Sequence, residues 1–408
     1  MKILFIVPYV PNLIRVRPYN LIRYLAARGH EITLLTLYTS PAERDDVKAL
    51  RSFCREVFAL PLPQWRSMAN SLLALPTHLP LQAVYCWQPA LSHLAQELTR
   101  RDGGFDLAHV EHLRGARYGL DLMKRNGGAS GSSRRLPVVW DSVDCITLLF
   151  RQAAGQSRRL LSRWLTHFEL GRTRRYEGWL TGQFDRVLVT SPHDRDELVG
   201  LMRGGALSTH VRVIPNGVDL EYYTPQNGDV PRDPATLVIS GKMSYHANVT
   251  MAVTFVEEVL PLIWQRHPEV RLVIVGKDPT AEVRALGRPP LIEVTGTVAD
   301  IRPYLHRATV AVAPIQYGAG IQNKVLEAMA CGLPVVTTSR AVSALAVEAG
   351  REVLTADTPQ EFAASVIRLL EDAAYREQVA RAGRHYVEEN HPWPKVIERL
   401  EEVYDEII

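Results

Sequence analysis

Short apolar runs alternate with longer amphipathic stretches along most of the chain, and this alternation restricts the possible folds more than any other feature. Short apolar runs are typical of strands buried on both faces, and amphipathic stretches between them are typical of helices that cover a sheet. The order predicts an α/β fold with parallel sheets. The expected strands are Ile3–Val7, Glu31–Thr36, Leu107–Val110, Val138–Trp140 and Arg186–Thr190 in the first half, and Thr236–Ser240, Arg271–Val275, Ile292–Thr295, Thr309–Ala313 and Val335–Thr338 in the second.

The two groups of strands predict two domains. A chain of 408 residues with 46% hydrophobic residues can bury the cores of about two domains of ordinary size. Val211–Pro225 separates the two groups, and Gln226–Pro234 is a polar segment with prolines, as expected of a linker. We therefore expect a first domain over residues 1–225, a second over residues 234–390, and a last amphipathic helix over Val396–Ile408.

Composition and charge argue against several other classes of protein. The net charge of +3 is the balance of 47 basic and 44 acidic residues, so nothing singles out nucleic acid as a partner. The four cysteines are far apart, without a CxxC pair or histidines at zinc spacing, which predicts a reduced, cytoplasmic setting. The apolar start Met1–Pro11 is too short for a signal sequence or a membrane span, and we interpret it as the first strand.

One segment of the second half, Ala313–Val336, carries the pattern of an anion-binding loop. Its buried strand is followed by Gly318 and Gly320, which allow backbone conformations that a side chain would block. A helix is expected to begin at about Ile321. The first N–H groups of this helix, together with the positive end of its dipole, point toward the loop and form a site for an anion.

Lys324 and Glu327 lie three residues apart and therefore on one face of this helix. A lysine can neutralise phosphate, and a glutamate can accept hydrogen bonds from the two hydroxyls of a ribose. A salt bridge on a solvated helix is the plain alternative for such a pair. The preceding glycines and the buried strand favour a site for a nucleotide diphosphate instead.

Two further strands of the second half end in glycine followed by lysine. Gly241 could let the backbone approach a phosphate, and Lys242 could pair with that phosphate. Gly276 follows the next strand, at the edge where doubly wound sheets bind ligands. We expect Gly276 to form a wall of the same pocket.

In the first half, titratable side chains gather at the end of the strand Leu107–Val110. His109, Glu111 and His112 lie at the edge where sites form in such sheets, and each histidine is also compatible with a core or surface position. Glu111 could order or deprotonate an acceptor hydroxyl, and His112 could donate a hydrogen bond to a donor sugar. These residues are candidates for the acceptor side of a reaction.

The segment after the first strand, Pro8–Arg17, contains no glycine. The G-x-G-x-x-G pattern of a nicotinamide-dependent oxidoreductase is therefore missing. Arg15 and Arg17 could instead meet an anionic acceptor, or be solvated. Asp141 and Asp144 follow a later strand, where capping of a helix explains them at least as well as a role in a site.

Together the motifs resemble those of the retaining glycosyltransferases of family GT4. Leu326–Val336 (LEAMACGLPVV) is nearly identical to the donor-binding motif of that family, and Ile214–Asp219 (IPNGVD) is similar to the end of its first domain. The resemblance implies a GT-B fold, which is two doubly wound Rossmann-like domains with an interdomain cleft. It further implies that the first domain binds the acceptor, that the second binds a nucleotide-diphosphate-sugar, and that a helix over residues 393–408 crosses back to the first domain.

The resemblance also implies roles for single residues. Glu327 matches the glutamate that binds the ribose of the donor, and Lys324 matches a lysine near the diphosphate. Gly241–Lys242 match the pair that begins the second domain, and the segment ending at Val298 resembles the one that lines the base through its backbone. An earlier glutamate that contacts the donor sugar in many members is replaced by Ala319.

The resemblance implies transfer of a sugar to a hydroxyl acceptor across the cleft, with retention of configuration. The lysines would offset the charge that develops on the diphosphate. The donor motif lacks a DxD-like carboxylate cluster, so we expect neither a metal nor another cofactor. The acceptor would be a sugar, a lipid-linked molecule or a small molecule, in cell-surface polysaccharide or glycolipid synthesis. The departures at Ala319 and Glu111 leave open a sugar-nucleotide epimerase or a non-catalytic scaffold subunit that binds the donor.

Residues 151–185 hold seven arginines and three carboxylates, interleaved with apolar residues such as Trp164 and Trp179. A basic amphipathic region of this kind can rest on an anionic membrane surface, and ordinary solvated helices explain the pattern as well. The pattern leaves open a peripheral position on the inner face of the membrane for an otherwise cytoplasmic protein.

Overall fold

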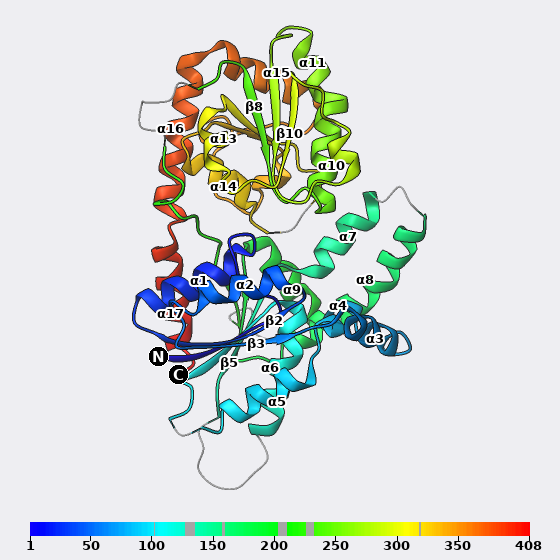
Figure 1. The fold of residues 1–408 in the computed structure, drawn as a ribbon, viewed down its shortest axis with the longest axis vertical. Coiled ribbons are helices and arrows are strands. Elements are labelled where there is room, and N and C mark those ends of the chain that lie inside the picture. Colours follow the sequence, from blue (N-terminus) through cyan, green and yellow to red (C-terminus); the bar gives the residue numbers. More distant parts are fainter. Residues whose placement is uncertain (102, 127–134, 157–159, 203–209, 226–231, 318–319) are drawn as a thin grey trace. The chain divides into compact units, whose positions relative to one another are not determined.

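The computed structural model describes residues 1–101, 103–126, 135–156, 160–202, 210–225, 232–317 and 320–408. These residues form two compact units (Figure 1). One unit consists of Met1–Pro215 and Trp393–Ile408, and the other of Asn216–Pro392. Each unit has its own parallel sheet with helices, as the alternation of apolar and amphipathic segments predicts.

The first unit contains a sheet of seven strands in the order β3-β2-β1-β4-β5-β6-β7, with all neighbours parallel. The strands are β1 (Lys2–Val7), β2 (Glu31–Tyr38), β3 (Glu56–Pro61), β4 (Leu107–Glu111), β5 (Val138–Val143), β6 (Arg186–Val189) and β7 (Val211–Val213). The strand order reverses between β1 and β4. Doubly wound sheets place their ligands at the carboxyl ends of the strands at such a point.

Helices connect successive strands, because parallel pairing requires a crossover. The helices of this unit are α1 (Val16–Ala27), α2 (Pro41–Leu50), α3 (Gln64–Ala74), α4 (Leu81–Tyr85), α5 (Pro89–Leu98), α6 (His112–Asn126), α7 (Ile146–Gln156), α8 (Leu160–Leu180), α9 (Pro192–Leu201) and α17 (Trp393–Asp405). Local sequence determines several of their starts. Ser40 and Ser191 cap α2 and α9 with their side-chain oxygens, and a proline occupies the first turn of both helices.

The second unit contains a sheet of six parallel strands in the order β10-β9-β8-β11-β12-β13. The strands are β8 (Thr236–Ser240), β9 (Arg271–Val275), β10 (Ile292–Gly296), β11 (Val310–Ala313), β12 (Val335–Thr337) and β13 (Leu354–Thr355). Here the order reverses between β8 and β11. The glycine loop and the Gly-Lys pairs follow the carboxyl ends of the strands around this point.

The helices of the second unit are α10 (His246–Thr254), a π-helical turn (Phe255–Val259), α11 (Leu260–Trp264), α12 (Ala281–Arg284), α13 (Arg302–Arg307), α14 (Asn323–Ala330), a short 3₁₀ turn (Arg340–Val342), α15 (Pro359–Glu371) and α16 (Ala373–Asn390). Pro261 lies in the first turn of α11 and lacks a backbone N–H, which accounts for the π-helical turn before it. Thr358 and Glu361 cap α15 reciprocally, each side chain accepting from the backbone of the other.

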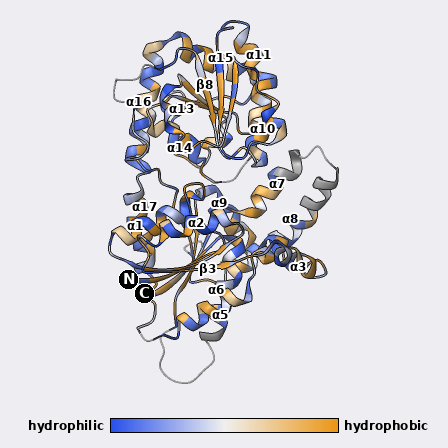
Figure 2. Ribbon diagram, in the orientation of Figure 1, coloured by the Kyte–Doolittle hydropathy of each residue, from blue (hydrophilic) through white to orange (hydrophobic). Residues whose placement is uncertain are grey.

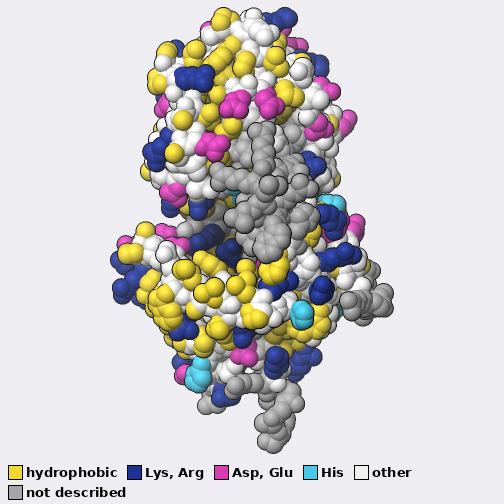
Figure 3. All heavy atoms as spheres, turned by 90° about the vertical axis from the view of Figure 1, so that its right-hand side faces the viewer, with side chains coloured by type: hydrophobic (Ala, Val, Ile, Leu, Met, Phe, Trp, Pro, Cys, Tyr) yellow, Lys and Arg dark blue, Asp and Glu magenta, His cyan; other side chains and the backbone are white. Residues whose placement is uncertain are grey.

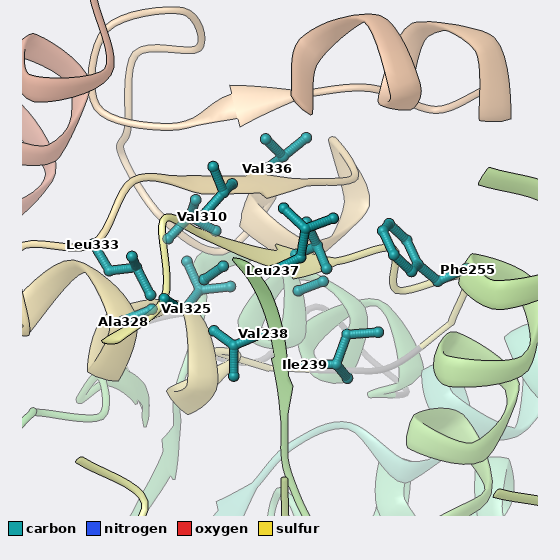
Figure 4. Close-up of a cluster of buried hydrophobic side chains, with 14 of the residues drawn as sticks. Leu237, Val238, Ile239, Phe255, Val310, Val325, Ala328, Leu333 and Val336 are labelled. Carbon is teal, nitrogen blue, oxygen red and sulfur yellow. The ribbon is translucent and has the colours of Figure 1, made fainter. Parts of the chain in front are cut away.

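The apolar cores lie against the two sheets. In the first unit, Leu4 and Ile6 of β1 belong to one core and Ile3 and Phe5 to another, because alternate residues of a strand point to opposite faces. The second unit has one continuous core, part of which Figure 4 shows around β8. In Figure 2 the strands of both sheets are predominantly hydrophobic and the helices are mixed.

All ten expected strands are present, with ends that differ by a few residues. The sequence did not predict β3, β7 or β13. β7 and β13 have three and two residues, too few to show a period. β3 is a half-buried edge strand with a short apolar run, Val57–Leu60, which the sequence analysis overlooked.

The last helix, α17, belongs to the first unit, where it packs against α1 and buries Trp393 and Tyr404 completely. The chain first passes to the second unit at Pro215, earlier than the expected boundary at residues 225–234. The segment after this point belongs to the second unit because the N–H of Val218 donates to the carbonyl oxygen of His391 (2.8 Å).

One stretch among the described residues, His246–Trp264, is long and apolar enough to cross a membrane by length and composition. It comprises α10, the π-helical turn and α11, and half of it is buried inside the protein. Its side chains Met251, Phe255 and Leu260 are part of the core of the second unit. This packing accounts for its apolar character.

Candidate functional site

Two glycines bring the ends of β8 and β9 into close contact. Gly241 and Gly276 have φ angles of 147° and 153°, in the region that favours glycine. A methyl group on Gly276 would lie 1.7 Å from the carbonyl oxygen of Gly241. The two residues that the sequence assigned to a phosphate pocket therefore lie side by side.

Asn248, the third residue of α10, links the two lysines of the predicted site. The Nζ of Lys324 donates to the Oδ1 of Asn248 (2.8 Å), and the Nδ2 of Asn248 donates to the carbonyl oxygen of Lys242 (2.9 Å). Asn248 is buried, and the side chain of Lys242 is exposed. Asn248 thereby directs Lys324 of α14 toward the glycine pair at the ends of β8 and β9.

Lys324 and Glu327 are partly removed from water. Burial lowers the pKa of Lys324 to about 8, although Glu327 acts in the opposite direction. Burial raises the pKa of Glu327 to about 7, against the opposing effects of Lys324 and of a hydrogen bond with Tyr223. An anionic ligand with a ribose diol would favour the charged forms of both groups. This environment differs from that of the solvated salt bridge that the sequence left open.

The loop before α14 is described only in part. Gly318 and Ala319 lie outside the described residues, so the predicted roles of both stay predictions. Gly320 has a φ of 68°, Ile321 is buried, and α14 begins at Asn323 rather than at Ile321. The side chain at the N-cap position makes no capping hydrogen bond, which is compatible with an anion at the first N–H groups of the helix.

A polar face of α10 holds Tyr317, the residue before the glycine loop. The ring of His246 stacks on that of Tyr317, with centroids 5.3 Å apart, and the His246 Nδ1 lies 2.9 Å from the tyrosine hydroxyl. The Oγ1 of Thr250 is 3.1 Å from the same hydroxyl. Sequence reasoning missed these residues and Asn248. The i,i+4 spacing of His246 and Thr250 on one face of an apolar helix is a signal that could have revealed these two residues, whereas Asn248 lies on another face of the helix.

A hydrogen bond from backbone to side chain joins the segments after β9 and β10. The N–H of Asp278 donates to the Oγ1 of Thr297 (3.3 Å), and Val298 is half-buried against the core. The donor residues predicted from the sequence therefore follow four neighbouring strands, β10, β9, β8 and β11. This arrangement gives one continuous surface at the carboxyl edge of the second sheet.

In the first unit, Glu111 and His112 form the junction of β4 and α6. Glu111 accepts a hydrogen bond from the hydroxyl of Tyr9 (2.9 Å), and burial, together with the charge of Asp141, raises its pKa to about 8. His112 has a φ of 63°, a strained value for a residue other than glycine that is often seen at functional positions. Burial lowers the pKa of His112 to about 3, so this ring is neutral at physiological pH.

Arg17 and His109 belong to a buried polar network. The Nε of Arg17 donates to the Oδ2 of Asp141 (2.7 Å), and its Nη1 donates to the carbonyl oxygen of Ile214 (2.9 Å). The Nδ1 of His109 lies 2.7 Å from the hydroxyl of Tyr404, and its Nε2 lies 3.6 Å from Asp141. These contacts give both side chains a structural role. The acceptor-binding role expected for them stays a prediction.

Arg15 lies closer to the predicted acceptor residues. Its Nη2 is 2.9 Å from the Oε1 of Glu43, and its guanidinium lies 4.8 Å from the ring centroid of Tyr9. Tyr9 also bonds Glu111 and meets the edge of His112. The structure thus gathers Arg15, Glu111 and His112 around Tyr9, which the sequence analysis did not single out.

Within the described part of the chain, no group of three or more His, Cys, Asp or Glu side chains is arranged to hold a metal ion. The lysines, the helix N-terminus and the glycine pair are groups that bind anions. The expectation of a reaction without metal or other cofactor stays a prediction.

Comparison with known families gives two matches. The family model described as "Glycosyltransferase Family 4" matches residues 15–222, and the model "Glycosyl transferases group 1" matches residues 234–372. The two matches together cover both units of the structure.

Curated relatives and solved structures are consistent with these matches. The chain is 28% identical to the glycogen synthase of Mycobacterium tuberculosis over 56% of each chain, and 28% identical to the D-inositol 3-phosphate glycosyltransferase of Salinispora arenicola over 57% of each. It therefore spans only about half the length of these relatives. Two solved structures are similar in fold. One is a HepE structure from Anabaena with UDP and glucose, with a TM-score of 0.69 and 16% sequence identity over all of both chains. The other is the sucrose-phosphate synthase of Thermosynechococcus elongatus, with a TM-score of 0.71 and 17% sequence identity over 99% of this chain and 98% of that one.

Proposed function

Because the chain belongs to glycosyltransferase family 4, with the two α/β units of a GT-B glycosyltransferase, we propose that it transfers a sugar from a nucleotide-diphosphate-sugar to a hydroxyl acceptor. One observation carries this proposal. Lys324 and Asn248 converge on the close pair Gly241 and Gly276, and Glu327 lies one turn further along α14. A diphosphate fits the cationic end of this arrangement, and a ribose fits its carboxylate end.

The proposed transfer of the sugar depends on stabilising the negative charge of the leaving diphosphate. When the bond between the anomeric carbon and the diphosphate breaks, the electron pair and the negative charge stay on the leaving diphosphate. Lys324, Lys242 and the N-terminus of α14 would stabilise that charge. The acceptor hydroxyl forms the new bond and loses its proton. We assign this proton to Glu111, since a carboxyl group with a pKa of about 8 is matched to proton transfer near neutral pH.

Retention of configuration and independence from metal are part of the proposal, on the strength of the sequence motifs. UDP is the first donor nucleotide to test, because it is bound in the structurally similar HepE of Anabaena. A sugar, a lipid-linked molecule or a small molecule would be the acceptor, in a cytoplasmic or peripheral-membrane setting. The membrane contact expected at residues 151–185 stays a proposal, and the side chains of residues 153–167 lie outside the described ones.

A thermal-shift screen against UDP, GDP, ADP, their sugar conjugates and NAD(P), with and without EDTA, tests the proposal. We expect one nucleoside diphosphate family to raise the melting temperature, with no effect of EDTA. Stabilisation by NAD(P) alone would contradict the donor site. Donor turnover without an acceptor would indicate an epimerase, and tight binding without turnover of any kind would indicate a scaffold subunit.

Glu327→Ala and Lys324→Ala should each weaken binding of the donor nucleotide roughly ten- to hundredfold, since each removes a charged hydrogen-bond partner worth about 1.5–3 kcal/mol. Isothermal titration with UDP or with the nucleotide found in the screen measures this change. Lys48→Ala, which removes an exposed lysine of the first unit, is the control and should bind like the native protein. Unchanged affinity in both site variants would remove the basis of the proposed donor site.

Donor binding should weaken as the pH rises above about 8. The pKa of Lys324 lies near 8 in the free protein, so above this pH the lysine must regain a proton before it can pair with phosphate. The dissociation constant should rise by up to about tenfold per pH unit between pH 8 and 9.5. The arginine of Lys324→Arg keeps its charge over this range, so the dissociation constant of this variant should not change with pH. A sloping profile in that variant would assign the titration to another group.

A further inference from the structure

Helix α3 is amphipathic in the reverse sense to an ordinary surface helix. Its small residues Ser67 and Ala74 are 2% and 3% exposed, whereas its large apolar residues face away from the unit. The exposed side chains are Trp65 (63%), Met68 (65%), Leu72 (63%) and Leu73 (76%), with Leu75 just beyond the helix. Several large apolar side chains exposed together on one helix mark an interaction site, whereas single exposed apolar residues are ordinary.

This orientation of α3 is held by specific polar contacts. The guanidinium of Arg172, on α8, donates to the carbonyl oxygens of Ala74, Leu75, Thr77 and Leu79, which follow one another at and beyond the end of α3. On the inner face, the Nδ2 of Asn70 donates to the carbonyl oxygen of Trp87 (2.8 Å). The apolar face is therefore presented to the surroundings by a fixed helix.

The surroundings of the patch are basic and aromatic. Residues 57–96 contain no aspartate or glutamate. The guanidinium of Arg66 lies 5.0 Å from the ring centroid of Trp65, and that of Arg114, on α6, lies 5.6 Å from the ring centroid of the exposed Tyr85. α4, which carries Tyr85, packs against both α3 and α6. Figure 3 shows hydrophobic side chains gathered on this face of the unit, with basic side chains at their edge.

We propose that α3 docks this protein on an anionic lipid surface, with its apolar side chains in the boundary between headgroups and acyl chains. Exposed tryptophan and tyrosine paired with arginine are suited to that boundary, where the rings lie in the apolar layer and the cations reach the lipid phosphates. A second copy of the chain is a poorer occupant. A two-fold interface would bring the Arg66 side chains of both copies to the same apolar patch, without acidic residues from 57–96 to compensate their charge.

This contact is separate from the one expected at residues 151–185. From that region Arg172 is used to hold α3, and Arg151 forms an ion pair with Glu197 (2.9 Å). Trp179 of α8 is also exposed (48%) and belongs to residues 151–185, so the variants Trp65→Ser and Trp179→Ser distinguish the two contacts. The proposal concerns docking and does not depend on the identity of the transferred sugar.

The test is flotation of the full chain with vesicles of phosphatidylcholine alone and of phosphatidylcholine with equal phosphatidylglycerol. The native protein should float with the anionic vesicles, less so at high salt. The variant Trp65→Ser/Leu72→Ser/Leu73→Ser should lose about tenfold or more of this binding, and Trp179→Ser should keep it. The melting temperature of the triple variant should match that of the native protein, because the replaced side chains are exposed. If it does not, Trp65→Ser alone is compared with Trp179→Ser.

Four outcomes would overturn the proposal. In the first, the native protein does not bind anionic vesicles, and in the second, the native protein and the folded Trp65 variants bind them equally. In the third, only Trp179→Ser loses binding. In the fourth, the native protein binds no vesicles but self-associates in sedimentation, and the triple variant does not self-associate. Donor binding, measured in solution, should be unchanged in the triple variant. A failure of the donor site would therefore be distinguishable from a failure of this docking surface.

Discussion

Gly276→Ala should abolish donor binding and lower the free energy of unfolding of the second unit by about 2–5 kcal/mol. The added methyl group would lie 1.7 Å from the carbonyl oxygen of Gly241 and 2.8 Å from its carbonyl carbon. Both are backbone atoms, which cannot rotate away as a flexible side chain can. The ends of β8 and β9 would have to separate, and Lys242 would move with them.

Gly350→Ala is the matched control. Gly350 of the second unit precedes β13 with a φ of 87°, so alanine is strained there also, but its methyl group would meet no atom within 4 Å. This variant should lose only about 1–2 kcal/mol and keep its donor affinity. Urea unfolding and nucleotide titration of both variants measure the difference. Equal effects in the two would show that backbone conformation, rather than the contact between strand ends, is what matters at Gly276.

Arg17→Ala should destabilise the first unit by about 3–5 kcal/mol, because it leaves the fully buried Asp141 without its cation. Burial alone would raise the pKa of Asp141, but the charge of Arg17 and the contact with His109 outweigh it and lower the pKa to about 2. The double variant Arg17→Ala/Asp141→Asn should lose less than the sum of the two single variants. Arg28→Ala removes an exposed ion pair with Glu401 and should destabilise the unit far less than Arg17→Ala.

The acid range gives an independent check on Arg17. The pKa of Asp141 is lower in the folded state, about 2, than in the unfolded chain, about 3.9. Its stabilising contribution is therefore complete above about pH 4 and is lost as the pH falls toward 2. The difference in unfolding free energy between native protein and Arg17→Ala should shrink across this window. A difference that stays constant from pH 7 to pH 2 would mean that Arg17 stabilises by packing and by its bond to Ile214 rather than through Asp141.

The sequence was a good guide wherever a structural feature depends on local backbone. The anion-binding pattern of Gly241, Gly276, Gly320 and α14 lies within single strand-loop-helix units, so the order of residues shows it directly. Asn248 and Tyr9 were not recognised because their roles arise from contacts across the fold. Asn248 reaches Lys324, far along the chain on α14, and Tyr9 reaches Glu111 on a neighbouring strand.

The difference between local backbone and contacts across the fold also explains why the sequence could not distinguish the two arginines after β1. In the sequence Arg15 and Arg17 are equivalent, two residues apart shortly after the first strand. In the structure Arg17 turns into the unit toward Asp141 and Ile214, whereas Arg15 stays half-buried beside Tyr9. No local pattern distinguishes them, because the partners of Arg17 come from β5 and from the segment after β7.

By itself, therefore, the sequence determined the two α/β units, the ten expected strands and the glycine-containing loops of the second unit, since periodicity and glycine act within a few residues of the chain. Only the tertiary structure decided which charged groups are buried and paired, and that α3 turns its large apolar side chains outward. Burial, pairing and pKa depend on neighbours that are distant in sequence, and these neighbours are defined only when the sheets have formed.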